Sequence, residues 1–98
     1  MSEYIISKKA LEDLRDIWIY TLDTWSEKQA DNYYQKLIDA FEYIASKPSS
    51  VGRSYKEVRS DYRGFPCGKH IVFYRVLKNG KIKIVRILHE RMDVQRHL

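Results

Sequence analysis

Two long stretches in the first half of the chain place apolar residues at helical spacing. Between residues 8 and 25 one broad stripe collects Ala10, Leu14, Ile17, Trp18, Leu22 and Trp25, with charged residues opposite. Between residues 26 and 47 a second stripe collects Ala30, Tyr34, Leu37, Phe41 and Ile44, widened by Tyr33, Ile38 and Ala45. Ser7 and Ser26 stand at the expected N-cap positions, and Lys47-Pro48 ends the second stretch. Because only residues 24–26 separate the stretches, we predict an antiparallel helical hairpin with both tryptophans in the core.

On both sides of this hairpin the apolar period changes to two. Tyr4–Ile6 predicts a short N-terminal strand, and residues 48–52 form a linker after the second helix. Three strands are predicted at Tyr55–Arg59, His70–Leu77 and Lys81–Leu88, with a loop or bulged connection over residues 60–68 because of its glycines and proline. The expected fold is therefore α+β: an N-terminal strand, an antiparallel α-helical hairpin and a three-stranded antiparallel sheet. The length fits a single domain over residues 1–98.

The Asn79-Gly80 dipeptide predicts a two-residue type I′ turn between the last two strands. Such a turn sets Tyr74 opposite Val85 and His70 opposite His89. One face, with Val72, Tyr74, Val76, Val85 and Ile87, then covers the helices. Arg75 and Arg86 fall among aliphatic residues on the other face, which indicates a partly covered, electropositive surface suited to binding.

Composition narrows the class of protein. With 44% hydrophobic and 13% aromatic residues the chain has the material for a packed core, which argues against disorder. The longest plain apolar run covers only residues 71–74, too short for a membrane span, and the first residues lack the apolar stretch of a signal peptide. Cys67 is the single cysteine, so no internal disulfide is possible. We expect a cytoplasmic protein.

The net charge of +5 is unevenly distributed. Residues 1–49 hold six Lys and Arg against nine Asp and Glu, whereas residues 50–98 hold twelve against four. This asymmetry indicates that the second half faces an anionic partner, or that a basic sheet region is neutralised by acidic helices. Both long helices carry acidic outer faces, so neither is expected to read DNA, and direct nucleic-acid binding is disfavoured.

Several segments, in order over nearly the whole chain, resemble the ParE family of bacterial toxins within the RelE/ParE superfamily. The matching stretches are Ala10-x-x-Asp13-Leu14-x-x-Ile17-x-x-Tyr20, Ala30-x-x-Tyr33, Ile44-Ala45-x-x-Pro48, Val58-Arg59, Gly68-x-His70-x-Val72-Phe73-Tyr74-Arg75 and Val85-Arg86-Ile87-Leu88-His89-x-x-Met92-Asp93-x-x-x-His97-Leu98. The resemblance implies the toxin of a type II toxin–antitoxin system, of the kind that stabilises plasmids or answers stress. It further implies DNA gyrase as the inhibited target and a ParD-like antitoxin as the neutralising partner.

RelE-type relatives instead cut messenger RNA on the ribosome, and this alternative depends on a few positions. When their Arg-Leu-Val-Tyr run is aligned on Tyr74, the nuclease arginine falls at Ile71, which cannot neutralise a phosphate. The C-terminal tyrosine of the nucleases is also missing, although His89, Arg91 and His97 could supply a substitute site. We expect a protein without catalytic residues. A member that has lost toxicity and acts as a binding module is the third alternative.

Candidate binding residues follow from the resemblance and from the charge pattern. The target-binding candidates are the basic residues on or after the last strands: Arg75, Arg86, His89, Arg91 and Arg96. The antitoxin-binding candidates combine apolar residues outside the helical stripes with two arginines: Ile19, Tyr20, Tyr43, Arg75 and Arg86. His70 and His89 should be cross-strand neighbours but have no placed carboxylate or third ligand, and Cys67 falls in a loop, so no metal and no cofactor are expected.

Overall fold

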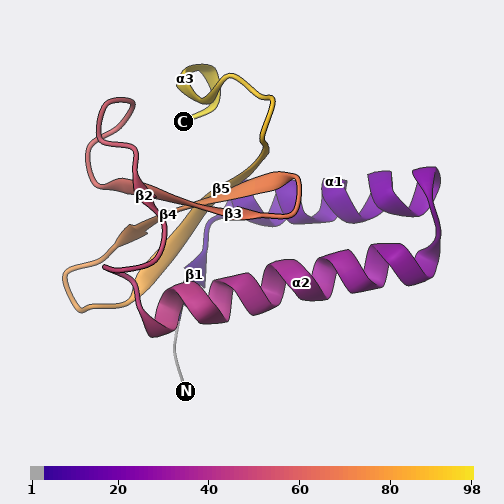
Figure 1. The fold of residues 1–98 in the computed structure, drawn as a ribbon, viewed down its shortest axis with the longest axis horizontal. Helices are drawn as coiled ribbons and strands as arrows, with labels where there is room; N and C mark the ends of the chain where they lie inside the picture. Colours follow the sequence, from indigo (N-terminus) through magenta and orange to yellow (C-terminus); the bar gives the residue numbers. More distant parts are fainter. Residues whose placement is uncertain (1–3) are drawn as a thin grey trace.

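A computed structural model describes residues 4–98 as one five-stranded sheet with a helical hairpin against one face (Figure 1). The elements are β1 (Tyr4–Ile6), α1 (Lys8–Thr24), α2 (Glu27–Ser46), β2 (Arg53–Ser54), β3 (Tyr62–Cys67), β4 (His70–Val76), β5 (Ile82–His89) and α3 (Val94–His97). The strand order is β1-β5-β4-β3-β2; β1 runs parallel to β5 and the other pairs are antiparallel. The α+β class is confirmed, but the sheet has five strands because β1 and β2 join its edges.

The helical hairpin forms as predicted. The Ser7 hydroxyl accepts a hydrogen bond from the amide of Ala10 (3.0 Å), and the Ser26 hydroxyl accepts one from the amide of Gln29 (3.1 Å). Each cap satisfies an amide that the first helical turn leaves without a partner. Lys47 ends α2 directly before Pro48, as expected.

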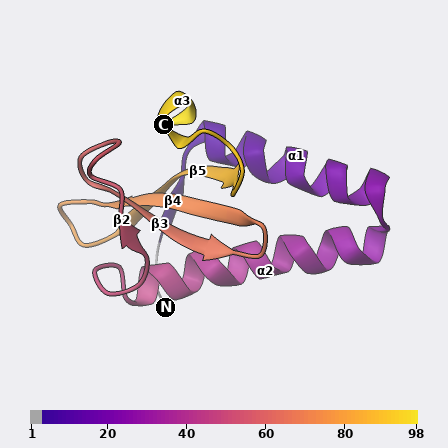
Figure 2. The same cartoon turned by 45° about the horizontal axis from the view of Figure 1, so that its top comes forward.

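The tip of the hairpin extends past the end of the sheet (Figure 2). The predicted core position of Trp25 is therefore wrong, because its side chain is 69% exposed at the end of α1. Tyr34 in the predicted α2 stripe is exposed as well. Trp18 is half-buried and donates a hydrogen bond from Nε1 to Asp31 (3.0 Å). Helical periodicity identifies the face that points toward the sheet, but it does not show where the sheet ends.

The strand predicted at Tyr55–Arg59 is wrong, and so is the loop predicted over residues 60–68. Only Arg53–Ser54 forms β2, residues 55–61 turn back, and Tyr62–Cys67 forms β3 against β4. Gly64 fits within this strand because the ring of Tyr55 lies where its Cβ would be. Pro66 fits because β2 pairs only with residues 63 and 64, so no partner on that side requires its missing N–H.

The register between β4 and β5 follows the prediction from His70 to Phe73 and differs from it between Tyr74 and Val76. His70 and Val72 face His89 and Ile87 as predicted, but Tyr74 faces Ile84, because a bulge leaves Val85 without an opposite residue. The turn contains three residues, 78–80, since Leu77 and Lys81 pair and, of these three, only Gly80 has a positive φ. The predicted register would have turned Lys83 toward the core, whereas the bulge turns Ile82 and Ile84 inward.

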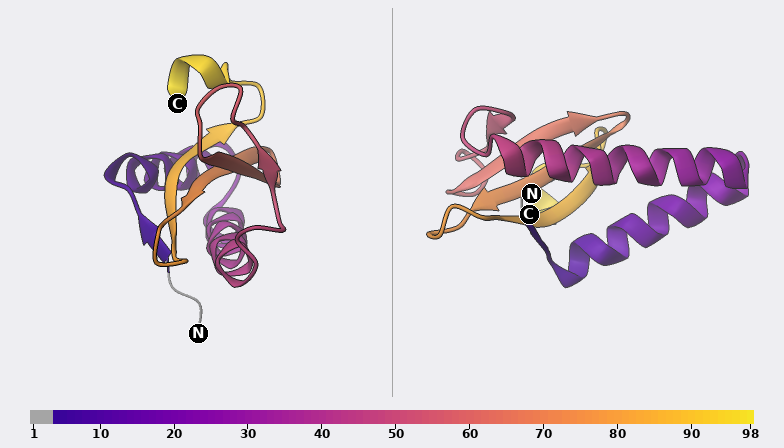
Figure 3. Two further views of the ribbon diagram at one scale, coloured as in Figure 1. Left: turned by 90° about the vertical axis from the view of Figure 1, so that its left-hand side faces the viewer. Right: turned by 90° about the horizontal axis from the view of Figure 1, so that it is seen from below.

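The core lies between the sheet and the hairpin and includes Leu14, Leu37, Phe41, Tyr74 and Ile84. A smaller cluster, Phe73, Val85 and Leu88, lies on the outer sheet face. Val94 and Leu98, from the C-terminal segment that contains α3, cover this cluster together with Tyr55 and Tyr62. Figure 3 shows α3 on the opposite side of the sheet from the hairpin. Of the helices described here, none is long and apolar enough to span a membrane.

Candidate partner-binding surfaces

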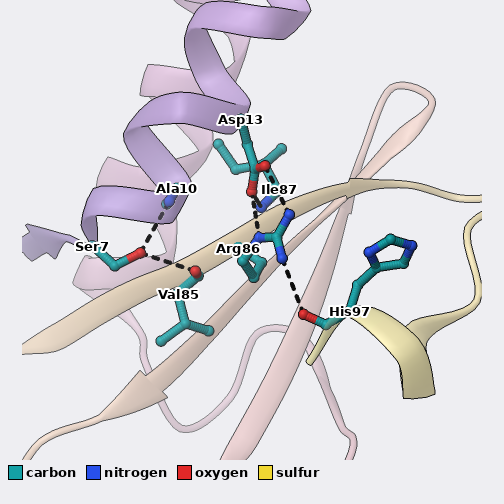
Figure 4. A network of polar contacts seen from close by, with 7 residues as sticks. All are labelled: Ser7, Ala10, Asp13, Val85, Arg86, Ile87 and His97. Carbon is teal, nitrogen blue, oxygen red and sulfur yellow. Dashed lines mark hydrogen bonds and ion pairs between the residues drawn. The ribbon is translucent and has the colours of Figure 1, made fainter.

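Arg86 lies inside a polar network that joins β5, α1 and the C-terminal segment (Figure 4). Its Nε donates to Asp13 Oδ2 (2.8 Å), its Nη2 to Asp13 Oδ1 (2.9 Å) and its Nη1 to the carbonyl oxygen of His97 (3.0 Å). The hydrogen bonds from Arg86 to Asp13 raise the pKa of the guanidinium. Both side chains are less than one-fifth exposed. Arg86 is therefore fixed by partners within the chain.

The same network covers the edge of β5 beyond the end of β1. The backbone amide of Ile87 donates to Asp13 Oδ2 (2.9 Å), and the Ser7 hydroxyl donates to the carbonyl oxygen of Val85 (2.9 Å). These side chains take the place of a neighbouring strand, so α1 protects a sheet edge that would otherwise be free to pair with another chain. Sequence reasoning named Arg86 but missed Asp13, because 73 residues separate them.

Arg75 is half-buried on the outer sheet face between Tyr62 and Lys83, its neighbours on the two adjoining strands. Its Nε is buried without a hydrogen-bond partner in the part of the chain that the structure describes. Two cations directly opposite each other are unfavourable, and an unpaired buried donor costs about 1–3 kcal/mol. A partner's carboxylate would offset the repulsion between Arg75 and Lys83, and the contact of Arg75 with a partner stays a prediction.

The remaining basic candidates lie at the end of β5 and in the C-terminal segment. Arg91 and Arg96 are exposed, and Arg96 forms only a 3.9 Å surface ion pair with Asp93. A pair of this kind contributes at most about 1 kcal/mol. His89 is half-buried against His70, with ring centroids 5.4 Å apart, and its Nδ1 accepts a hydrogen bond from the amide of Arg91 (3.1 Å). Arg91 and Arg96 are thus the candidates most available to a partner.

His70 is held by a hydrogen bond between its Nδ1 and the Tyr33 hydroxyl (2.7 Å). Burial, and then the neighbouring His89, lower the pKa of His70 to about 4. A neutral His89 that accepts at Nδ1 carries its proton on Nε2, the opposite of what metal binding at Nε2 requires. Among residues 4–98 no group of three or more metal-ligating side chains converges. The contacts of His70 with Tyr33 and His89 hold α2 against the ends of β4 and β5.

A cleft of about 600 Å³ separates the tip of the hairpin from the ends of β4 and β5. Its lining includes Tyr20 and Trp25 from α1, and Lys69, His89 and Arg91 from the strand ends. We call it the hairpin–sheet cleft. Two of the target candidates and one of the antitoxin candidates, Tyr20, meet here. Sequence reasoning placed Trp25 in the core instead, because the cleft arises only when the hairpin packs on the sheet.

The other apolar antitoxin candidates lie elsewhere. Ile19 and Tyr43 are exposed and line neither this cleft nor a second hollow of about 640 Å³ between the two helices. That hollow is lined in part by Leu11, Trp18 and Tyr34. Tyr43 packs against Phe65, with ring centroids 5.6 Å apart. The structure therefore does not join Ile19, Tyr20 and Tyr43 into one groove.

The family described as ParE toxin of type II toxin-antitoxin system, parDE, matches residues 4–94 of the sequence. The chain belongs to the ParE toxin family. It is 42% identical over 97 residues to Toxin ParE1 of Mycobacterium tuberculosis, covering 99% of this chain and 98% of the relative. It is 38% identical over 98 residues to Toxin ParE1 of Caulobacter vibrioides, covering 100% and 99%. Toxin ParE of Escherichia coli is 32% identical over 98 residues, covering 100% and 94%.

Solved structures confirm the fold of this ParE family member. The chromosomal ParDE toxin–antitoxin system from P. aeruginosa aligns with a TM-score of 0.77 at 19% identity, over 91% of this chain and 96% of that one. The toxin-antitoxin complex RelBE2 from Mycobacterium tuberculosis aligns with a TM-score of 0.64 at 16% identity, over 90% and 96%. The same architecture occurs in a ParDE and in a RelBE system, so the fold alone does not distinguish between the targets of the two kinds of toxin.

Proposed function

We propose that this ParE-family toxin inhibits DNA gyrase and is neutralised by a ParD-like antitoxin in the cytoplasm. Family membership supports a toxin of a toxin–antitoxin system. The observation that favours gyrase over messenger RNA is the environment of Ile71. This residue takes the place of the nuclease arginine, and it packs beside the outer cluster of Phe73, Val85 and Leu88. An aliphatic side chain in apolar surroundings provides no charge to stabilise a reacting phosphate.

The exposed cations supply the proposed contact with gyrase. Arg91 and Arg96 are exposed in the C-terminal segment, and Arg96 forms a 3.9 Å surface ion pair with Asp93. Exposed charges of this kind accelerate association with an acidic surface and are weakened by salt. Arg75 adds a half-buried cation on the same side of the sheet as this segment.

The proposed antitoxin is acidic and covers the exposed apolar side chains of the helices. Leu11, Tyr20 and Trp25 are each at least half exposed, which a partner helix with an apolar stripe would reduce. The solved neighbours in both ParDE and RelBE systems support an antitoxin as the natural partner. Arg75, rather than Arg86, is expected to receive an antitoxin carboxylate.

One experiment separates gyrase inhibition from messenger RNA cleavage. Purified toxin is assayed for gyrase supercoiling and, in parallel, for primer-extension cleavage of translated messenger RNA. We expect loss of supercoiling without cleavage within codons. Cleavage with unaffected supercoiling would establish the nuclease alternative, and no effect of folded protein in either assay would indicate a non-toxic binding module.

The double variant Arg91→Ala/Arg96→Ala tests the surface itself. It should raise the toxin concentration needed for half-inhibition of gyrase by about tenfold, equivalent to about 1.4 kcal/mol, and reduce the salt dependence of inhibition. Lys8→Ala/Lys9→Ala removes the same charge from the exposed start of α1 and should change neither. Equal effects of the two variants would mean that inhibition depends only on the net charge of the toxin. That result would contradict a specific contact of Arg91 and Arg96 with gyrase.

A further inference from the structure

The two walls of the hairpin–sheet cleft carry different chemistry. The hairpin contributes the aromatic side chains Tyr20 and Trp25 near its tip. The sheet contributes Lys69 and Arg91 at the ends of its strands, beside His70 and His89. With a volume of about 600 Å³, the cleft falls within the range of sites that enclose small ligands, about 300–1,000 Å³.

The aromatic wall offers two unused ring faces. Tyr20 and Trp25 are 67% and 69% exposed, and neither side chain makes a ring contact or hydrogen bond within residues 4–98. Burying such a ring under a flat ligand gains both apolar area and stacking. Stacking of a nucleobase on an aromatic side chain contributes about 1–3 kcal/mol.

The basic wall has an excess of cations. Lys69 and Arg91 line this wall, and Lys36 of α2 adds a cation on the hairpin side, against a single carboxylate in the lining, that of Glu90. None of the three cations forms an ion pair in the described part of the chain. His89 adds a donor, because its Nδ1 accepts from the amide of Arg91 and its proton therefore lies on Nε2. Lysine, arginine and an imidazole N–H together suit a phosphate.

The backbone that carries this wall is held firmly in place. The Tyr33 hydroxyl accepts from the amide of Lys69 (3.0 Å) and contacts both His70 Nδ1 (2.7 Å) and the carbonyl oxygen of Cys67 (3.2 Å). The amide of Glu90 donates to the carbonyl oxygen of Lys69 (2.9 Å). Because these bonds fix Lys69 and Glu90 relative to α2, little backbone order has to be gained when a ligand binds.

We propose that the hairpin–sheet cleft binds a nucleoside phosphate, with the base on Trp25 and Tyr20 and the phosphates on Lys69 and Arg91. The exposed rings of Tyr20 and Trp25 and the cations Lys69 and Arg91 lie on opposite walls, which matches a ligand that has one flat end and one anionic end. An acidic peptide would need its charges and apolar groups intermingled along a longer groove. This site shares Arg91 with the proposed gyrase contact, and Tyr20 and Trp25 with the proposed antitoxin contact, so its test uses the toxin alone.

The test uses isothermal titration of the full chain with ATP, and with adenosine and tripolyphosphate as its two halves. ATP should bind at least about tenfold more tightly than either half, because only ATP contacts both walls. Trp25→Ala should weaken ATP about tenfold without changing tripolyphosphate, and Lys69→Ala/Arg91→Ala should weaken ATP and tripolyphosphate alike. Lys8→Ala/Lys9→Ala, outside the cleft, should leave all three unchanged, and circular dichroism verifies that every variant is folded.

Three results would overturn the site. ATP, GTP and AMP could all fail to bind at millimolar concentration. ATP and tripolyphosphate could bind equally well and be unaffected by Trp25→Ala, which would mean a non-specific charge effect. Finally, an acidic peptide with aromatic residues could bind in a manner sensitive to Trp25→Ala while nucleotides do not, which would assign the cleft to a protein segment. Gyrase inhibition is measured separately, so failure of either proposal is recognised on its own.

Discussion

At the scale of single residues, Asp13 links α1 to the sheet through three hydrogen bonds. One carboxylate accepts from Nε and Nη2 of Arg86 and from the backbone amide of Ile87. Three donors to one partly buried carboxylate mean that its loss leaves both a cation and an amide without a partner. Removing one member of such a pair costs more than the pair itself contributes.

Asp13→Asn should therefore lower the free energy of unfolding by about 2–3 kcal/mol, less than the cost for a fully buried pair because water reaches part of this one. Urea denaturation followed by circular dichroism measures the loss. Asp16→Asn, on the same helix but with a 69% exposed side chain, is the matched control and should cost less than about 0.5 kcal/mol. Similar losses for both variants would show that the network contributes nothing beyond surface charge.

His70 gives the protein a dependence on pH with a definite sign. Its pKa in the folded protein is lowered from 6.5 to about 4, by burial first and His89 second, although Asp13 and Glu90 act weakly in the opposite direction. The unfolded chain thus binds the proton more readily. Stability from this group is complete above about pH 6.5 and falls as the pH drops from 6.5 toward 4.

Thermal unfolding midpoints between pH 7.5 and 4.5 check this expectation. His70→Gln, whose amide can still bond the Tyr33 hydroxyl, should show a shallower decline on acidification than the unmodified chain. His97→Gln removes an exposed histidine and should retain the original decline. An unchanged slope in His70→Gln would mean that another group is responsible.

At the scale of elements, the predictions that succeeded rest on local signals. Ser7 and Ser26 cap the helices that follow them, and Pro48 ends the second helix. The failures depend on partners distant in sequence. Gly64 looks like a loop residue until the ring of Tyr55 is placed over it, and Asn79-Gly80 looks like a two-residue turn until Lys83 is found to face the core in that register.

The candidate sites show the same distinction. Arg91 and Arg96, named as target-binding candidates, lie exposed in the C-terminal segment, and their contact with a target stays a prediction. Arg86 was expected on a binding surface, but its partner Asp13 could be found only in three dimensions. One signal for the bulge was present in the sequence. Apolar residues at 82, 84 and 87 change phase within β5, as an extra strand residue requires.

Two glycines in turns of the sheet should respond differently to the same substitution. Gly80 has φ +84° with open space around it, so Gly80→Ala should cost about 1 kcal/mol from backbone strain alone. Gly68 has φ +61°, and a Cβ there would lie 2.5 Å from the Tyr33 hydroxyl oxygen. Gly68→Ala should cost at least twice as much, because Tyr33 must also give up its hydrogen bonds. Equal unfolding midpoints in urea would contradict this difference.

At the scale of the whole molecule, the protein has two apolar layers of unequal strength. The inner layer is closed by two long helices, whereas the outer cluster of Phe73, Val85 and Leu88 is closed by a short C-terminal segment and two tyrosines. Arg59 and Arg86 hold the end of this segment through hydrogen bonds to the carbonyl oxygens of Leu98 and His97, each 3.0 Å long. The outer layer is therefore the part that opens at least cost.

Val94→Ala/Leu98→Ala should reduce stability by about 1–2 kcal/mol and increase binding of a hydrophobic dye, because the outer cluster loses part of its cover. Gln95→Ala changes an exposed residue of the same segment and should alter neither quantity. Unchanged dye binding in the double variant would mean that the tyrosines alone shield the cluster.

The bulge at Val85 has a consequence for how this fold can change length. Without Val85, the residues of β5 would alternate between the two faces without interruption, and His70 would still lie opposite His89. The same holds at the turn end, where Val76 would still lie opposite Ile82. A one-residue deletion at this point therefore preserves both ends of the hairpin, whereas a deletion elsewhere in β5 would reverse the facing of the residues beyond it. Val85 thus marks the position in the central pair of strands where a change of one residue in length keeps the register at both ends.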